Sequence, residues 1–133
     1  MADPNKLIIK AAKHGDVAGL KTLLAGDPKL IDARDTDGST PLHCATWKGH
    51  VDAAQFLVQS GADVNATNQN EHWGTTPLHA AAHANQPKIA QLLIDNGANV
   101  KAPDMEGRTP LFHTTFHKAK AVAKILEPLS ETT

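Results

Sequence analysis

Two pairs of histidines are spaced so that they could bind a metal ion. His79 and His83 lie four residues apart, as do His113 and His117. Residues four apart share one face of a helix, so each pair could chelate Zn²⁺ or Ni²⁺ if a third ligand converged on it. The sequence offers no cysteine partner and no residue placed to orient the ring nitrogens. It therefore favours surface and structural histidines and predicts no cofactor, with a metal-binding or enzymatic protein as the alternative.

Cys44 is the only cysteine and the only thiol that could act as a nucleophile. A catalytic thiol needs a lowered pKa and an adjacent base. His43 precedes it, but neighbours along a helix point in different directions. Free cysteines are among the most buried residue types, so we expect a small buried side chain, no catalytic residue and no enzyme activity. A lone cysteine also excludes an internal disulfide and fits a reducing compartment.

The segments around these residues recur along the chain. Thr-Pro-Leu-His occupies residues 40–43 and 76–79, and the degraded form Thr-Pro-Leu-Phe occupies residues 109–112. The spacings are 76 − 40 = 36 and 109 − 76 = 33 residues. A period near 33 residues indicates stacked repeats, each of which buries its apolar face against a neighbour.

Each copy of the motif predicts a pair of helices. The threonine can cap the first helix, and the proline suits the first helical position, where its missing N–H costs nothing. A more apolar second helix follows, because apolar residues lie three and four apart in residues 51–58 and 89–94. Glycine at positions 61 and 97 then marks the end of that helix.

Together these motifs resemble the ankyrin-repeat family. The resemblance rests on Thr-Pro-Leu-His, on Lys-Gly-His at residues 48–50 and on Gly-Ala-Asp-Val-Asn-Ala at residues 61–66, and it covers about residues 4–126. It implies an all-α solenoid of stacked helix pairs with projecting β-hairpin loops, whose usual activity is to bind other proteins. It also implies that His43 and His79 hydrogen-bond adjacent hairpins together and that His50 is structural.

We expect one domain over residues 1–133, with a cap at each end whose outer face meets water. Residues 67–74 form a connection three residues longer than its counterparts, and such insertions map to loops that often bind partners. Glu127-Pro128 is predicted to stop the last helix, so that residues 129–133 fray. The repeats are placed at about residues 4–36, 37–72, 73–105 and 106–128.

The resemblance implies that a partner is gripped by the hairpin tips and the exposed end of the first helix. Both tryptophans fall at such positions, and tryptophan is enriched among binding hot spots. In the competing interpretations Trp47 packs within the stack, Trp73 folds over the inserted loop, and the acidic tip residues only solvate turns. The predicted partner-binding residues are Trp47, Lys48, His72, Trp73, His83, Phe116 and His117, with Asp37, Ser39, Met105, Glu106 and Arg108 at the tips.

Asn65 lies in a context that looks like that of hydroxylated asparagines in this family. Asp63-Val64 directly precedes it, and Leu57 lies eight residues before it. The competing and preferred interpretation is that Asn65 only hydrogen-bonds the hairpin turn.

The composition is that of an ordinary globular protein. The net charge is −1 and 41% of the residues are hydrophobic, so neither nucleic acid nor an anionic membrane surface is favoured as a partner. The N-terminus is polar, and no apolar run approaches the ~20 residues of a membrane span. We expect a soluble, cytoplasmic monomer that binds another protein as a regulator, inhibitor or adaptor. A purely structural repeat protein is the remaining alternative.

Overall fold

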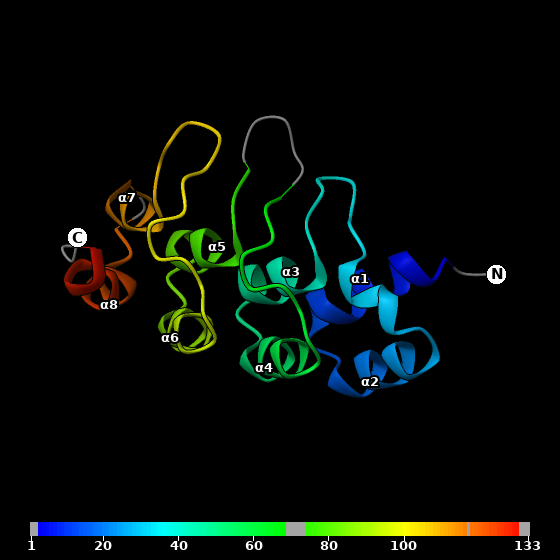
Figure 1. The fold of residues 1–133 in the computed structure, drawn as a ribbon. Coiled ribbons are helices and arrows are strands. Elements are labelled where there is room, and N and C mark those ends of the chain that lie inside the picture. The colour runs from blue at the N-terminus through cyan, green and yellow to red at the C-terminus, as the bar shows by residue number, and fades with distance from the viewer. Residues whose placement is uncertain (1–2, 69–73, 117, 131–133) are drawn as a thin grey trace.

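The computed structural model describes residues 3–68, 74–116 and 118–130. Within these residues the chain forms four pairs of helices and one short 3₁₀ helix (Figure 1). The 3₁₀ helix, η1 (Pro28–Asp32), follows the second helix of the first pair. The paired helices are α1 (Pro4–His14) with α2 (Val17–Gly26), α3 (Pro41–Lys48) with α4 (Val51–Gln59), α5 (Pro77–His83) with α6 (Pro87–Asp95), and α7 (Pro110–Phe116) with α8 (Lys120–Ser130).

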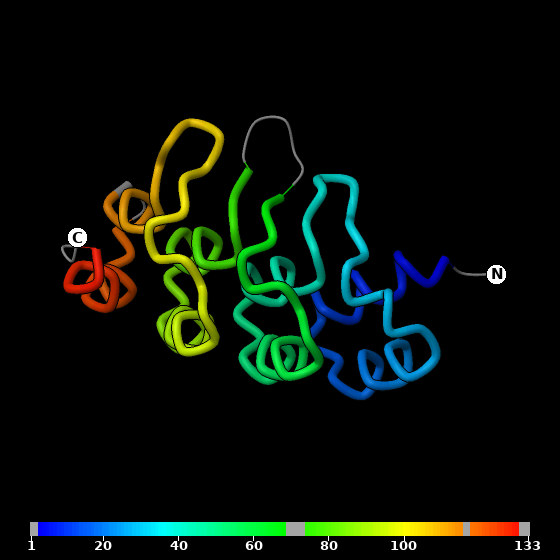
Figure 2. The backbone as a smooth tube through the Cα atoms, viewed as in Figure 1, coloured from blue at the N-terminus to red at the C-terminus, as the bar shows by residue number. Residues whose placement is uncertain are grey.

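The helices stack in two rows. The first helix of every pair lies in one row and the second helix in the other, and the ends of the chain lie at opposite ends of the stack (Figure 1). The loops between successive pairs project on the side of the first row (Figure 2). This architecture is a solenoid of stacked helix pairs, so the predicted fold class is confirmed.

The projecting loops are closed by turn hydrogen bonds. The Asp35 amide donates to the Ser39 carbonyl (2.9 Å), and the Asp104 amide donates to the Arg108 carbonyl (2.9 Å). No residue in the described part of the chain is in a strand. The hairpin shape therefore comes from the aspartate-led turns rather than from a strand ladder.

The repeated motif starts the first helix of the second and third pairs. The Thr76 hydroxyl accepts a hydrogen bond from the His79 amide (3.4 Å), and His79 Nδ1 accepts one from the Thr76 amide (3.0 Å). Thr40 and His43 make the same reciprocal pair. This capping box satisfies two backbone donors at the helix start and fixes the orientation of the histidine ring.

The core runs along the stack between the two rows. Leu78 on the first row is 1% exposed, and Leu57 and Leu93 on the second row are fully buried. Ala81 and Ala82 are also fully buried, and their small side chains let α5 pack closely against both neighbouring helices of its row. Each pair is therefore stabilised by its neighbours, as the repeat period predicts.

The turn inside each helix pair requires one residue in the left-handed region. Glycine occupies this position in the first two pairs, with φ of 67° at Gly15 and 76° at Gly49. Asn85 and Lys118 occupy it in the last two pairs, with φ of 53° and 56°. Asparagine tolerates this conformation, whereas for lysine the Cβ atom approaches the following carbonyl oxygen.

Replacing Lys118 by glycine is therefore expected to stabilise the protein by about 0.5 to 1 kcal/mol, since relief of strain exceeds the added entropy of the unfolded chain. Urea unfolding followed by circular dichroism measures the change. Lys124→Gly is the matched control, because Lys124 is an exposed residue inside α8. There glycine is expected to cost about 1 kcal/mol. A loss of stability in both variants would contradict the strain at Lys118.

The last helix ends later than predicted. Helix α8 continues through Pro128 to Ser130 instead of stopping at Glu127-Pro128. Proline here removes one backbone donor in the last turn, while Val122 and Leu126 of the same helix are fully buried and hold it against the stack. Residues 131–133, the rest of the predicted frayed tail, lie outside the described residues.

Candidate functional site

The motif histidines are structural parts of the surface that carries the loops. His43 is fully buried, and its Nδ1 accepts the Thr40 amide (3.2 Å). Its Nε2 therefore carries the proton and donates to the Thr75 carbonyl of the next hairpin (2.8 Å). Burial lowers the pKa of His43 to about 4, so the ring stays neutral. The predicted link between adjacent hairpins is confirmed here.

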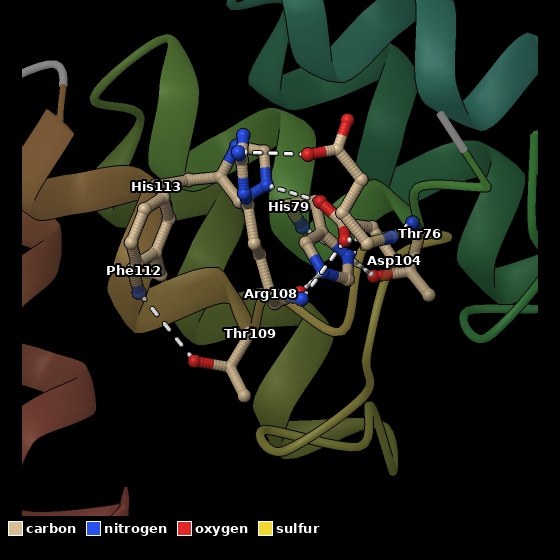
Figure 3. A network of polar contacts seen from close by, with 8 residues as sticks. Thr76, His79, Asp104, Arg108, Thr109, Phe112 and His113 are labelled. Carbon is tan, nitrogen blue, oxygen red and sulfur yellow. Dashed lines mark hydrogen bonds and ion pairs between the residues drawn. The ribbon is translucent and has the colours of Figure 1, made fainter. Parts of the chain in front are cut away.

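His79 makes the same link one repeat further on. Its Nδ1 accepts the Thr76 amide, and its Nε2 donates to the Arg108 carbonyl (2.9 Å) (Figure 3). Burial lowers its pKa below the ordinary histidine value. Both ring nitrogens make hydrogen bonds, so His79 joins the start of its own helix to the following hairpin.

His113 is the residue that follows the motif position in the last repeat. Its Nε2 lies 3.0 Å from Asp104 Oδ2, and Asp104 Oδ1 accepts the amides of Glu106 and Arg108 (both 2.9 Å) (Figure 3). Burial alone would raise the pKa of Asp104, but these hydrogen bonds hold it below its usual value. The carboxylate therefore closes the third hairpin and joins it to α7.

His79, Asp104 and His113 together form a cluster whose ligand atoms lie within 4.8 Å of one another. A divalent ion would need an unprotonated nitrogen from His79, because three protein ligands are the usual minimum. The Nδ1 lone pair is used by the Thr76 amide, and Nε2 is the protonated donor to Arg108. The residues therefore do not fit a metal ion without loss of the helix cap or the hairpin link.

A row of rings crosses the first-row helices. Trp47 at the end of α3 packs edge-on against His83 of α5, with 4.4 Å between ring centroids. His83 in turn lies 6.5 Å from the ring of His113 on α7. Trp47 and His83 are each half-buried, so they pack partly within the stack and remain partly exposed to solvent. The structure thus brings together two of the predicted contact residues, and Lys48 beside them is exposed.

The tips of the hairpins differ in exposure. Met105 is 62% exposed and neighbours Glu106, which pairs with Arg108 at 2.7 Å. Asp37 is also exposed, but Ser39 is buried, contrary to its expected place at an exposed tip. Its hydroxyl accepts a hydrogen bond from the Asn68 side chain of the next hairpin, and this contact withdraws it from the surface.

Four predicted contact residues cannot be placed in this surface. His72, Trp73 and His117 lie outside the described residues. Phe116 closes α7, but its side chain is likewise outside the description.

Cys44 matches the simpler interpretation of the sequence, and Asn65 makes hydrogen bonds to the next repeat. Cys44 is 4% exposed, and burial raises the pKa of its thiol to about 12, which is the opposite of an activated nucleophile. Asn65 donates to the Gly97 carbonyl (3.1 Å) and accepts from the Asn99 amide (2.7 Å), so it ties its turn to that of the next repeat.

Stacked helix pairs, each started by a threonine–histidine cap that also holds the next hairpin, define a repeat protein of the solenoid class. Sequence models of this class match the chain, with "Ankyrin repeats (3 copies)" over residues 2–68 and "Ankyrin repeats (many copies)" over residues 48–94. The first match covers half of the sequence. The chain belongs to the ankyrin-repeat family, whose repeats are generally protein–protein interaction modules.

Similar proteins share the repeats within much longer chains. The sequence is 44% identical over 63 residues to Serine/threonine-protein kinase VIK of Arabidopsis thaliana and 39% identical over 64 residues to Ankyrin repeat domain-containing protein 49 of Homo sapiens. It is 37% identical over 121 residues to Inversin of Gallus gallus. These matches cover 47%, 48% and 90% of this chain but only 14%, 27% and 11% of the respective relatives. The similarity therefore spans only a small part of each relative.

The helices of the described residues are too short or too polar to cross a membrane.

Proposed function

We propose that this protein binds a partner protein on one continuous surface and thereby regulates, inhibits or recruits it. The surface, here called the docking face, comprises the exposed parts of the first-row helices and the hairpin tips. Its described members are Trp47, Lys48 and His83 on the helices, with Asp37, Met105, Glu106 and Arg108 at the tips.

The contact between Trp47 and His83 carries the proposal. Two half-buried rings from successive repeats support each other at 4.4 Å, so the indole is held in one orientation before any partner arrives. A side chain that is already ordered loses little entropy on binding, and indoles are prominent among residues that dominate binding energy. Met105 adds a large apolar side chain at the third tip, where it is 62% exposed.

The charged residues of the docking face are expected to orient the partner more than to raise its affinity. Glu106 and Arg108 pair with each other at an exposed site, where such pairs contribute little to stability. Exposed charges at the rim of an interface steer encounter and exclude wrong partners. Helix and tip residues therefore have separate roles. Trp47 contributes binding energy, and the charged residues at the tips align the partner on the surface.

Replacing Trp47 by alanine is expected to weaken partner binding by about 2 kcal/mol, or roughly 30-fold, because a buried indole contact is lost. The partner is isolated by affinity capture on the wild-type protein, and its affinity for each variant is then measured by calorimetry. Phe56→Ala is the matched control, since Phe56 is a half-buried aromatic on α4 in the opposite row. Circular dichroism verifies that both variants are folded.

The alternatives predict other outcomes. Equal weakening by Trp47→Ala and Phe56→Ala would place the interface elsewhere and contradict the docking face. Retention of full affinity in Trp47→Ala would make Trp47 a packing residue. If the wild-type protein captures no partner under any condition, a purely structural role explains the result and the binding proposal fails.

A further inference from the structure

A groove of about 470 Å³ lies at the N-terminal end of the stack, between α1 and the first projecting loop. The blue helix and the cyan loop that border it appear at the right of Figure 2. One side is formed by Lys6, Lys10 and Lys13 of α1, and the other by Arg34, Asp35 and Thr36 of the loop. The nearly buried Ile9 also lines it.

The three lysines of α1 form a line along the groove. They lie at positions i, i+4 and i+7, which is one face of a helix, and they span roughly 10 Å at a rise of 1.5 Å per residue. Lys6 and Lys10 are exposed, and within residues 3–68, 74–116 and 118–130 neither has an ion-pair partner. Lys13 is 3.9 Å from Asp35, at the limit of an ion pair.

The two carboxylates in the groove do not neutralise it. Asp3 Oδ1 accepts the Asn5 amide (2.9 Å) as the cap of α1. Asp35 Oδ1 accepts the amides of Asp37 and Ser39 (both 2.9 Å) and so closes the first loop.

Four cations thus line the groove with two carboxylates that already have backbone partners. One of the cations, Arg34, also donates from Nη1 to the Gly38 and Thr67 carbonyls, so the three lysines are the cations left to meet a ligand. The lining of the groove therefore carries two more positive than negative charges, although the whole chain carries a net charge of −1.

We propose that this groove binds an extended, acidic segment of the partner protein, an inference that rests on the proposed function and specifies its partner. Side chains on one face of an extended peptide repeat every ~6.6 Å. That spacing is close to the rise of ~6 Å between Lys6 and Lys10, so acidic residues at alternate positions of the peptide meet these two lysines. The two carboxylates and the small number of cations disfavour nucleic acid, which needs an extended positive surface.

The test uses a fluorescein-labelled peptide of eight residues that alternate glutamate with serine, and a control peptide with glutamine in place of glutamate. Anisotropy is measured at low salt with the wild-type chain and two double variants. Lys6→Gln/Lys10→Gln removes two charges from the groove. Lys88→Gln/Lys124→Gln removes two exposed charges from helices of the other row and gives the same net charge.

The glutamate peptide is expected to bind and the glutamine peptide is not. The Lys6→Gln/Lys10→Gln variant is expected to bind the glutamate peptide about tenfold more weakly, and the Lys88→Gln/Lys124→Gln variant as the wild type does. Added salt should weaken binding, because exposed charges are screened. Equal affinity for both peptides, equal loss in both variants, or tighter binding of a single-stranded RNA of equal charge would overturn the proposal.

The same variants separate this inference from the proposed function. If Lys6→Gln/Lys10→Gln keeps full affinity for the captured partner while Trp47→Ala loses it, the docking face stands and the acidic-segment proposal fails. If the glutamate peptide binds the groove as expected but Trp47→Ala has no effect on the partner, the acidic-segment proposal stands and the docking face fails.

Discussion

Lowering the pH from 7 to 4 is expected to remove about 3 kcal/mol of folding stability through His43 alone. Burial lowers the pKa of His43 from 6.5 to about 4 in the folded protein, while the unfolded chain takes up a proton near 6.5. The unfolded state therefore binds the proton first as the pH falls. The stabilising contribution of the neutral ring is complete above pH 6.5 and is lost progressively toward pH 4.

His79 acts in the same direction, since burial also lowers its pKa. Asp104, whose pKa is lowered, adds a further loss below the ordinary aspartate range, because its carboxylate must then take up a proton. Urea unfolding at a series of pH values measures the total. With a native stability of about 5 to 15 kcal/mol, the protein is expected to approach unfolding near pH 4.

A pair of variants assigns this pH dependence to its source. His43→Gln removes the titrating ring, so the slope of stability between pH 6.5 and 4 should decrease even though the stability at pH 7 falls. Leu57→Val lowers stability by about 1 kcal/mol without removing a titratable group, and the slope should remain. An unchanged slope in His43→Gln would show that the buried histidines do not cause the acid sensitivity.

Truncating Leu57 to alanine is expected to cost about 3 to 5 kcal/mol. Leu57 is fully buried on α4, and α4 packs against both neighbouring helices of its row. The substitution removes three side-chain carbons and leaves a cavity that adjacent repeats cannot fill without moving. This loss is a large part of the total stability of a domain of this size.

Leu129→Ala is the control for the cavity effect. Leu129 lies near the end of α8 and is 36% exposed, so its truncation is expected to cost less than about 1 kcal/mol. Both variants are compared by urea unfolding monitored by circular dichroism. Similar losses for the two leucines would contradict the assignment of the core to the layer between the two helix rows.

The sequence alone predicts the parts of the structure that repeat. Threonine and proline at a fixed spacing predict the helix starts, and the motif histidines predict the hairpin links that His43 and His79 make. The period of the motif predicts the stacked pairs. These features follow from local chemistry, so each copy of the motif reproduces them.

Features that occur in one repeat only could not be predicted in this way. The contact of His113 with Asp104 has no counterpart at Ala80, the equivalent position of the previous repeat. The buried Ser39 hydroxyl accepts a hydrogen bond from Asn68, which is 29 residues away in the next hairpin. Long-range contacts of this kind depend on the relative positions of neighbouring loops, which a single copy of the motif does not determine.

The docking face was predictable from the sequence only in part. Trp47 and His83 were identified by their positions in the repeat, and their mutual contact emerged only from the packing of α3 against α5. The lysines of α1 belong to none of the repeated motifs. Their alignment beside the first loop makes them one wall of a groove.

Hydrogen exchange with and without the captured partner tests the central claim most directly. The docking face predicts that the partner slows amide exchange in residues 41–48 and 77–83 and in the third hairpin tip, 104–108. Exchange in residues 51–59 and 87–95 of the opposite row should remain unchanged. Protection confined to the opposite row, with none on the first-row helices or the tip, would contradict the account.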